Sequence, residues 1–447
     1  MGIYSVEPPR TRRSPRRGMK ILFVHNNFPA QFGPVARALA RDPEVELAAI
    51  GSMTSRAIQG VDLVKYRMPP GDVSQTHPFA RRFDVECRRA EQVLYGLSSL
   101  IASGFVPDII VAHPGWGETL PLRSAFPRAQ FLLYCEFFYG TDGRDVGFDP
   151  EFPSTGLDGD VALKLKNAAT LLALSDCDRA LSPTRWQRAT FPKHFQSKID
   201  VIHEGVDTDV ARPNSEASFD LGSGKRLTRA DQVVTFVARN LEPMRGYHVF
   251  MRTLPEILAR LPAAHVLVIG GDGTSYGARP PEGETWKSIF LSEVADKIDH
   301  ARVHFTGRLP HRQFIRALQI SSAHVYLTYP FVLSWSVLEA MSCGCIVIGS
   351  DTPPVRELID GNNGILVPFF DRREIADRIV EAVTDGRKFH AMRRHARQYV
   401  LDRYDSERVG VPRTLELLRA CMGWRDAGGS AAATAGAALK LPSVAAR

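Results

Sequence analysis

Short hydrophobic runs alternate with longer amphipathic stretches along almost the whole chain. Near-continuous apolar runs separated by helical patterns are typical of parallel sheets that are covered by helices on both faces. The pattern therefore predicts an α/β fold of doubly wound units. The predicted strands cover residues 20–25, 45–50, 62–66, 108–113, 130–135 and 198–203 in the first half, and 233–239, 265–270, 302–307, 324–329, 345–350 and 364–368 in the second.

A polar stretch rich in Gly and Ser, "ARPNSEASFDLGSGKRLTRAD", separates the two sets of strands and predicts a linker. The tail is rich in Ala and of low complexity, so we expect it to be disordered. The predicted divisions are a disordered basic arm at 1–18, a Rossmann-like domain at 19–210, the linker at 211–231, a second Rossmann-like domain at 232–405, a helix at 406–425 that packs back toward the N-terminal domain, and the tail at 426–447.

The composition is that of a globular protein, with 44% hydrophobic and 23% charged residues among 447. Part of the net charge of +7 lies in the arm, where "RTRRSPRR" holds five arginines. Such an arm is either a solvated tail or a contact for anionic lipid headgroups or a phosphorylated substrate. Nucleic acid is not indicated, because no stripe of basic and aromatic residues recurs.

The chain shows no pattern of a signal peptide, and its 6 cysteines form no C-x-x-C pair. We expect a cytoplasmic protein with reduced thiols, with peripheral contact at the inner face of the membrane through the arm. The sequences "DTD" at 207–209 and "DCD" at 176–178 resemble metal-binding motifs of sugar transferases. Neither ends a predicted strand, so we interpret both as turn residues and expect no metal and no other cofactor.

The stretch "LTYPFVLSWSVLEAMSCGC", residues 327–345, joins a predicted strand to a helix that begins near Ser334. Free N–H groups at a helix start suit a phosphate. Ser336 and Glu339 share one face of this helix, beside Trp335, so Glu339 could accept hydrogen bonds from a ribose. An N-cap serine followed by a solvated glutamate explains the same residues.

Arg239 ends the first strand of the second domain, and Arg245 follows before the next helix. Two guanidinium groups at this position could neutralise a leaving diphosphate, whereas the alternative is a pair of surface arginines. Gly271 and Asp272 follow the next strand without a full G-x-G-x-x-G pattern, so a tight turn competes with a ligand loop. Arg308 ends a further strand, where the backbone could meet a base.

Candidate residues of the first domain also follow predicted strands. Asn27 and Gly33 lie in "NNFPAQFG", and Trp116 and Glu118 lie in "HPGWGETL", where Trp116 is either a platform for a sugar or a loop anchor. Glu136 lies among aromatic residues in "YCEFFYG". It could orient or deprotonate an acceptor hydroxyl, or it could pair with a nearby arginine.

Together these motifs resemble the retaining glycosyltransferases of family 4, which have the GT-B fold of two facing Rossmann-like domains. The resemblance covers about residues 19–421 and rests most on "RNLEPMRG", "VIHEGVDT" and "VLEAMSCGCIVIGSDTPPVRELIDGNNGILVP". The motifs "HPGWGETL" and "LTYPFVLSWSVLEAM" are similar to one bacterial subgroup. The resemblance implies a nucleoside-diphosphate sugar on the C-terminal domain, with Arg239 and Arg245 on the diphosphate and Glu339 on the ribose. It also implies a saccharide or lipid-linked acceptor on the N-terminal domain, in cell-surface polysaccharide biosynthesis.

The sequence departs from the family pattern at several positions. Phe331 stands where the family has the first of two glutamates, Arg245 replaces a lysine, and Glu136 lies near the place of a histidine. The N-terminal loop lacks the usual double glycine. A catalytically silent sugar-nucleotide-binding subunit and a sugar-nucleotide epimerase therefore remain alternatives. A dinucleotide oxidoreductase is disfavoured, because neither domain has the full glycine fingerprint.

Overall fold

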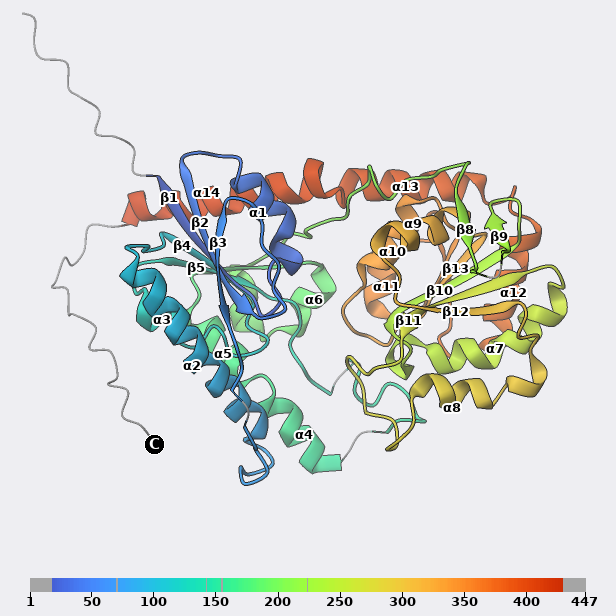
Figure 1. Ribbon diagram of the computed structural model, residues 1–447, viewed down its shortest axis with the longest axis horizontal. Helices are drawn as coiled ribbons and strands as arrows, with labels where there is room; N and C mark the ends of the chain where they lie inside the picture. Colours follow the sequence, from blue (N-terminus) through green and yellow to red (C-terminus); the bar gives the residue numbers. More distant parts are fainter. Residues whose placement is uncertain (1–17, 70, 142, 154–155, 223, 429–447) are drawn as a thin grey trace, which may run out of the picture.

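The computed structural model describes residues 18–69, 71–141, 143–153, 156–222 and 224–428. Two domains lie side by side, each with one parallel sheet between layers of helices (Figure 1). The predicted fold class, two doubly wound α/β domains with parallel sheets, is confirmed. Within the described part of the chain, no helix combines the length and hydrophobicity needed to cross a bilayer.

The N-terminal sheet has seven parallel strands in the order β3-β2-β1-β4-β5-β6-β7. The order reverses beside β1, so the crevice at the carboxyl ends of β1 and β4 is the expected place for a ligand. The strands are β1 (Met19–Val24), β2 (Val45–Ser52), β3 (Val61–Tyr66), β4 (Ile109–Ala112), β5 (Gln130–Tyr134), β6 (Arg179–Ser182) and β7 (Ile199–Val201).

The C-terminal sheet has six parallel strands in the order β12-β11-β10-β13-β14-β15. Its order reverses between β10 and β13, which places the ends of these two strands at a second crevice. The strands are β10 (Val233–Asn240), β11 (His265–Gly271), β12 (Val303–Gly307), β13 (Ala323–Tyr326), β14 (Val347–Ser350) and β15 (Ile365–Val367).

Helices cover both faces of the N-terminal sheet because its strands are apolar on both sides. One face packs on α1 (Gly33–Leu39) and on the long α14 (Val411–Gly428), whose Leu417 and Leu418 enter the N-terminal core. The other face packs on α2 (Arg81–Ala102) and α5 (Ala168–Asp176). The other helices of this part of the chain are α3 (Leu122–Ala125), α4 (Gly156–Leu165) and α6 (Arg185–Thr190).

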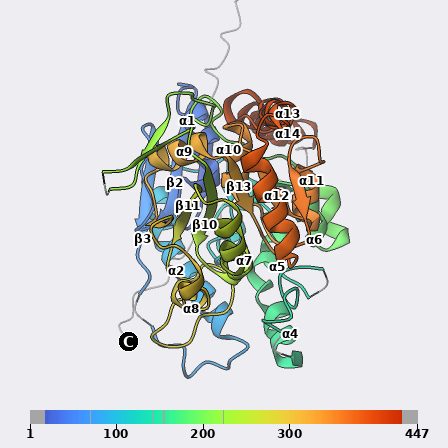
Figure 2. The same ribbon diagram turned by 90° about the vertical axis from the view of Figure 1, so that its right-hand side faces the viewer.

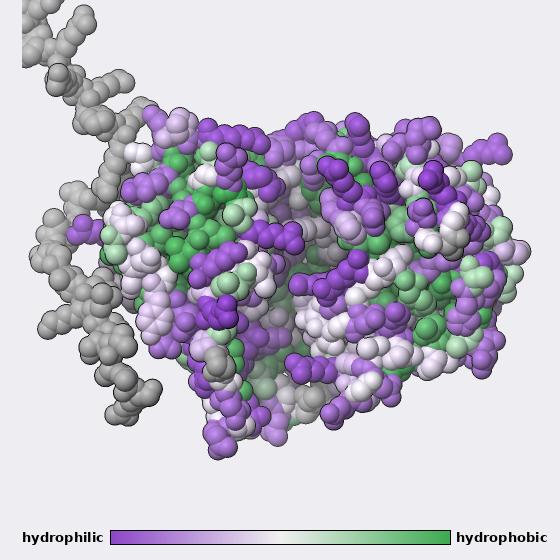
Figure 3. Space-filling view, in the orientation of Figure 1, coloured by the Kyte–Doolittle hydropathy of each residue, from purple (hydrophilic) through white to green (hydrophobic). Residues whose placement is uncertain are grey.

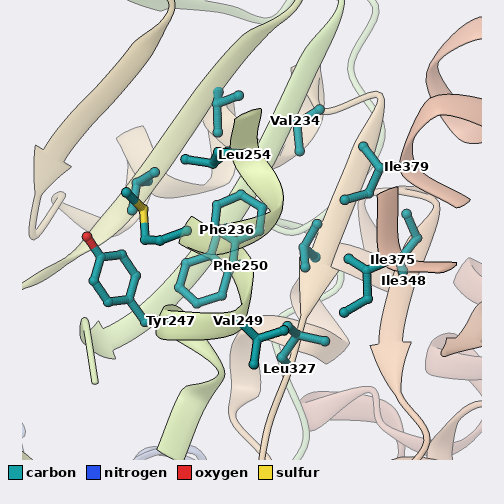
Figure 4. Packing of buried hydrophobic residues seen from close by; sticks show 14 of the residues in the cluster. Val234, Phe236, Tyr247, Val249, Phe250, Leu254, Leu327, Ile348, Ile375 and Ile379 are labelled. Carbon is teal, nitrogen blue, oxygen red and sulfur yellow. The ribbon is translucent and has the colours of Figure 1, made fainter. Parts of the chain in front are cut away.

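In the C-terminal domain, α7 (Tyr247–Arg260) and α12 (Arg372–Thr384) lie together on one face of the sheet, as Figure 2 shows. Figure 4 shows Phe236 of β10 packed on Phe250 of α7, with ring centroids 4.6 Å apart. The other helices of this domain are α8 (Trp286–Ser292), α9 (His311–Ile320), α10 (Trp335–Ser342), α11 (Pro353–Leu358) and α13 (His390–Arg403). Short 3-10 or π turns lie at 30–32 and 193–198 in the N-terminal domain and at 243–245, 295–297 and 406–410 further along the chain.

The segment 211–231, predicted as a linker, instead holds an antiparallel hairpin of β8 (Ser218–Asp220) and β9 (Arg226–Thr228). Phe219 and Leu227 are buried in the core beneath α9, so this segment is part of the C-terminal domain. The predicted disorder at 1–18 and 426–447 lies outside the described residues, apart from Gly18 and the end of α14 at 426–428.

The chain passes between the domains twice at one hinge, where the two passes pair with each other. Val206 N donates to Tyr404 O at 2.8 Å, and Ser406 N donates to Val206 O at 2.9 Å. Gly205 has a φ of 77°, and a Cβ there would lie 2.6 Å from Tyr404 O. Only glycine fits this position without strain, because the left-handed conformation and the close backbone both exclude a side chain.

We predict that Phe250→Ala destabilises the C-terminal domain by about 3–5 kcal/mol, because truncation of a buried phenyl ring leaves a cavity. Urea denaturation followed by circular dichroism measures the loss. The control is Leu157→Ala, since Leu157 is 79% exposed and its truncation should change stability by less than about 0.5 kcal/mol. Equal stability of the two variants would contradict the packing described here.

Candidate active site between the domains

The carboxyl ends of the two sheets face each other across the gap between the domains. Trp335, at the start of α10, donates its Nε1 proton to Glu204 Oε1 of the N-terminal domain at 2.5 Å. Phe331 meets Phe137, which follows β5, with ring centroids 4.7 Å apart. Figure 3 shows the surface hollowed between the two domains. Residues that follow the strands of both sheets therefore meet at one site.

Arg245 lies at the centre of this site, and it is only 6% exposed. Its guanidinium donates to Thr328 Oγ1 at 2.9 Å and to Val332 O at 3.0 Å. The rings of Tyr276 and Phe331 lie beside it, with centroids 5.3 and 5.6 Å away. Within the described residues no carboxylate forms an ion pair with it. The cation is thus held by neutral acceptors and aromatic rings.

The start of α10 lies next to this arginine. Ser334 caps the helix, since its Oγ accepts from Ser336 N at 3.2 Å and lies 2.7 Å from Ser336 Oγ. The N–H of Ser334 donates to the hydroxyl of Tyr326 at 2.8 Å, which fixes the helix start to the end of β13. Trp335 is 43% exposed beside these serines. The predicted helix start therefore lies at the gap.

Glu339 lies one turn into α10, and its side chain is 13% exposed. His311 at the start of α9 contacts it, with Nε2 2.6 Å from Glu339 Oε1. The hydrogen bond to this carboxylate is the main cause that raises the pKa of His311 above its usual value. His311 thus contacts one of the two carboxylate oxygens of Glu339, the residue predicted to bind a ribose.

The other predicted donor residues lie at neighbouring strand ends. Arg239 is exposed on β10, and among the described residues no hydrogen bond or ion pair holds its guanidinium. Gly271 ends β11, where an added Cβ would lie 2.7 Å from Nε of Arg308. Asp272 is exposed and pairs with Lys287 at 3.5 Å. These residues surround the end of the C-terminal sheet but make few contacts with one another.

A chain of hydrogen bonds fixes Glu136 in the N-terminal domain. The backbone N–H of Asn27 donates to His25 Nδ1 at 2.9 Å, and His25 Nε2 lies 2.9 Å from Gln31 Oε1. Gln31 Nε2 in turn donates to Glu136 Oε1 at 2.9 Å. His113 Nε2 lies 3.5 Å from the other carboxylate oxygen. Burial works to raise the pKa of Glu136, but His113 and Gln31 together hold it below its usual value. The carboxylate is therefore ionised at neutral pH.

Trp116 lies beside this chain of hydrogen bonds. Its ring stacks on His113 with centroids 4.5 Å apart, and it lies 5.2 Å from the ring of His25. Trp116 is partly exposed. It therefore anchors the loop after β4 and leaves part of its surface open.

Two predicted acceptor-side residues, Glu118 and Gly33, are buried. Glu118 is fully buried, where it accepts from the hydroxyl of Tyr66 at 2.6 Å and lies 3.8 Å from Arg89. Burial raises its pKa, so it is an internal hydrogen-bonding group of the N-terminal domain. Gly33 is buried at the start of α1, where an added Cβ would lie 3.3 Å from the guanidinium of Arg37. The prediction that Glu118 contacts an acceptor is wrong, because its side chain is buried and bonded inside the domain. The acceptor contact of Gly33 stays a prediction.

The sequence analysis missed several residues that build the site, namely His25, Gln31, His113, Tyr134 and Glu204. Glu204 accepts from both domains, since the hydroxyl of Tyr134 donates to its Oε2 at 2.8 Å. His25 and His113 follow the strands β1 and β4, so position at a strand end was a signal for them. Gln31 lies in the 3-10 turn at 30–32 and Glu204 lies in a loop, and only the tertiary contacts reveal them.

Among the described residues, one group of acidic and histidine side chains has the spacing to hold a metal ion, namely Asp149, Glu151 and His248. Their oxygens already have partners, because the hydroxyl of Tyr329 donates to Asp149 and Arg252 donates twice to Glu151. This donor set is a contact between the domains, since Asp149 and Glu151 come from the N-terminal half and the other residues from the C-terminal half.

Family models match both halves of the chain. Residues 43–211 match the "Glycosyl transferase family 4 group", and residues 231–385 match "Glycosyl transferases group 1". Both domains are glycosyltransferase domains. The family 4 type expected from the motifs is supported by the match of the N-terminal domain, and the boundary between the two matches falls in the segment 211–231.

Known proteins similar to these glycosyltransferase domains include the D-inositol 3-phosphate glycosyltransferase of Mycolicibacterium smegmatis, 28% identical over 190 residues. That alignment covers 42% of this chain and 40% of the relative's length. Sucrose-phosphate synthase from Thermosynechococcus elongatus has a TM-score of 0.69 at 17% identity, over 91% of this chain and 100% of that one. Anabaena HepE, solved with UDP and glucose, has a TM-score of 0.61 at 17% identity, over 90% and 100%. These structures establish the GT-B fold.

We predict that the pKa of His311, measured by NMR titration, lies above about 6.5 and falls toward that value in Glu339→Gln. Because the folded pKa is raised, the His311–Glu339 pair stabilises the fold fully below about pH 6.5 and loses this effect as the pH rises through the folded pKa. The control Glu256→Gln, on α7, should leave the titration unchanged. A titration of His311 that is the same with and without the Glu339 carboxylate would contradict the contact.

Proposed function

We propose that this chain transfers a glycosyl group from a nucleoside-diphosphate sugar to a hydroxyl acceptor, with retention of configuration. The observation that carries the proposal is the buried guanidinium of Arg245, which has no bonded carboxylate and lies beside the start of α10. Glu136 and Glu242 interact electrostatically with Arg245 but form no ion pair with it. Burial of a cation without a bonded counter-charge is costly, so an anionic ligand at this position stabilises the site. A diphosphate supplies that charge and suits both the guanidinium and the helix start.

The donor would lie along the carboxyl ends of β10 and β13. Arg245 and Arg239 would contact the diphosphate. The N–H of Trp335 at the start of α10 would contact a phosphate, because the N–H groups of Ser334 and Ser336 already donate to the hydroxyls of Tyr326 and Ser334. Glu339 would accept hydrogen bonds from the ribose. His311 would keep Glu339 in place through the bond at 2.6 Å. HepE, a protein of the same fold, was solved with UDP, which supports a nucleotide at this kind of site.

The acceptor would lie on the N-terminal side, next to Glu136 and the exposed part of Trp116. The lowered pKa of Glu136 makes it a weak base, so it is better suited to orient the acceptor hydroxyl than to remove its proton. In the reaction the bond between the anomeric carbon and the diphosphate oxygen breaks, and a bond to the acceptor oxygen forms on the same face. The acceptor proton passes to the departing phosphate oxygen, whose negative charge the two arginines stabilise. A saccharide or lipid-linked acceptor of cell-surface polysaccharide assembly fits this reaction.

A silent sugar-nucleotide-binding subunit is the second candidate, and Phe331 favours it. This side chain is 3% exposed and packs between Phe137 of the N-terminal domain and Tyr276, with ring centroids 4.7 and 5.0 Å away. A phenyl ring accepts no hydrogen bond from sugar hydroxyls. Nucleotide binding without glycosyl transfer or donor hydrolysis would support this candidate.

We predict that Arg239→Ala weakens the binding of a nucleoside diphosphate roughly ten- to hundredfold, which is the effect of losing a hydrogen bond between charged groups. Isothermal titration calorimetry with UDP, GDP and ADP measures the affinities. Arg239 is a clean test because it is exposed and forms no contact on which folding depends. The matched control is Arg394→Ala on the exposed face of α13. Unchanged affinity in both Arg239→Ala and Glu339→Ala would overturn the assignment of the site.

We also predict that glycosyl transfer continues in an excess of EDTA, because fixed arginines neutralise the leaving group. Turnover is measured as released nucleoside diphosphate, with and without chelator, at equal ionic strength. A loss of activity that Mg²⁺ or Mn²⁺ restores would mean that a divalent cation supplies the charge, and the role given to the arginines would be wrong.

A further inference from the structure

A part of the N-terminal domain reaches across the gap and docks on the C-terminal domain. We call residues 143–153, between β5 and α4, the crossing segment. Figure 1 shows this part of the chain leaving the N-terminal sheet and passing beneath the C-terminal domain near α8. Phe148 meets Tyr329, with ring centroids 5.1 Å apart, and Phe152 meets Trp286 at 5.4 Å. The hinge is thus not the only connection between the domains in the described part of the chain.

The crossing segment carries two buried acids, Asp145 and Asp149, and Asp149 is the one that contacts the C-terminal domain. Asp149 is 2% exposed, and its Oδ2 accepts from the hydroxyl of Tyr329 at 2.5 Å and lies 2.9 Å from His248 Nε2. Its Oδ1 accepts from the backbone N–H of Glu151 at 2.9 Å, so both oxygens are used. Although burial opposes ionisation, the bonds from His248 and Tyr329 hold the pKa of Asp149 below its usual value. An ionised group this well bonded fixes the position of its partners.

Tyr329 belongs to the loop that holds the central arginine. Its backbone N–H donates to Met244 O at 3.0 Å, next to Arg245 in sequence. The guanidinium of Arg245 donates to Oγ1 of Thr328, the residue before Tyr329, at 2.9 Å. It also donates to the carbonyl of Val332, three residues after Tyr329, at 3.0 Å. A shift of Tyr329 therefore moves both acceptors of the guanidinium together.

We propose that Asp149 is a positioning residue of the N-terminal domain that sets the place of Arg245 through Tyr329. The inference rests on the proposed function, in which Arg245 binds the diphosphate. Docking of the crossing segment fixes the loop 327–333, and the loop fixes the guanidinium. Full affinity for the diphosphate thus requires the two domains to be in contact, although none of the crossing segment touches the ligand.

The test compares Asp149→Asn and Tyr329→Phe in binding UDP and GDP, measured by calorimetry, with melting temperatures recorded alongside. We expect each variant to weaken binding roughly tenfold, the size of one hydrogen bond to a charged group. Tyr329→Phe removes only a hydroxyl, so it keeps the test valid if Asp149→Asn folds poorly. The control is Glu151→Gln, since Glu151 joins the crossing segment to Arg252 at the surface and should change the affinity less than twofold.

A double-mutant cycle separates positioning from a general structural role. If Asp149 acts through Arg245, then Asp149→Asn has no further effect on binding in an Arg245→Ala background. Additive effects of the two substitutions, or unchanged affinity in Asp149→Asn and Tyr329→Phe, would overturn the inference while the proposed function stands. Failure of the unaltered protein to bind either UDP or GDP would instead remove the proposed function, and the inference with it.

Discussion

A guanidinium buried without a bonded carboxylate is the constraint on which the site depends. Arg245 is 6% exposed, and transfer of a charge out of water costs several kcal/mol unless partners replace the lost hydration. Thr328 and Val332 supply only neutral oxygens. The fold tolerates this because the turn is fixed from behind, where Gly246 has a φ of 69° and a Cβ would lie 2.3 Å from Leu327. The turn, the end of β13 and the start of α10 therefore form one unit.

The second constraint is that the site has two halves on separate sheets. The two passes of the chain through the hinge are hydrogen-bonded to each other at Val206, so the domains can rotate there without breaking hydrogen bonds within either sheet. The contacts across the gap differ in kind: Trp335 and Glu204 share one exposed hydrogen bond, whereas Asp149 is buried with its partners. Water competes for the first and not for the second. The crossing segment therefore limits domain opening more strongly than the contacts at the mouth of the site.

Much of this architecture follows from local sequence, and the exceptions have physical reasons. Apolar strands buried on both faces are visible as continuous runs, so the predicted strands lie close to those observed. The strand β6, Arg179–Ser182, was not predicted, because it is short and begins with a charged residue. The hairpin within 211–231 has strands of three residues, and it is stable because Phe219 and Leu227 pack on α9, which no local pattern encodes.

The candidate site divides in the same way. The positions of Arg239, Ser334 and Glu339 near the gap were predictable, because each lies at or shortly after the carboxyl end of a parallel strand and the topology alone brings strand ends together. Glu118 also follows a strand, but its carboxylate turns inward to Tyr66. Side-chain direction depends on packing partners far apart in sequence, as does the contact between Gln31 and Glu136. The sequence thus predicted where a residue lies in the fold, but not the direction in which its side chain points.

Phe331 contacts both the buried arginine and the other domain. A carboxylate at this place would lie beside Arg245 and form the ion pair that the arginine now lacks, whereas the phenyl ring leaves the cation to its ligand and offers its face, with the centroid 5.6 Å away. The same ring meets Phe137 of the other domain at 4.7 Å. The position thus exchanges hydrogen bonding to a sugar for contact between the domains. If the proposed donor binds here, its sugar would be recognised by other polar groups, of which the exposed Asp272 and the ionised Glu136 lie on opposite domains.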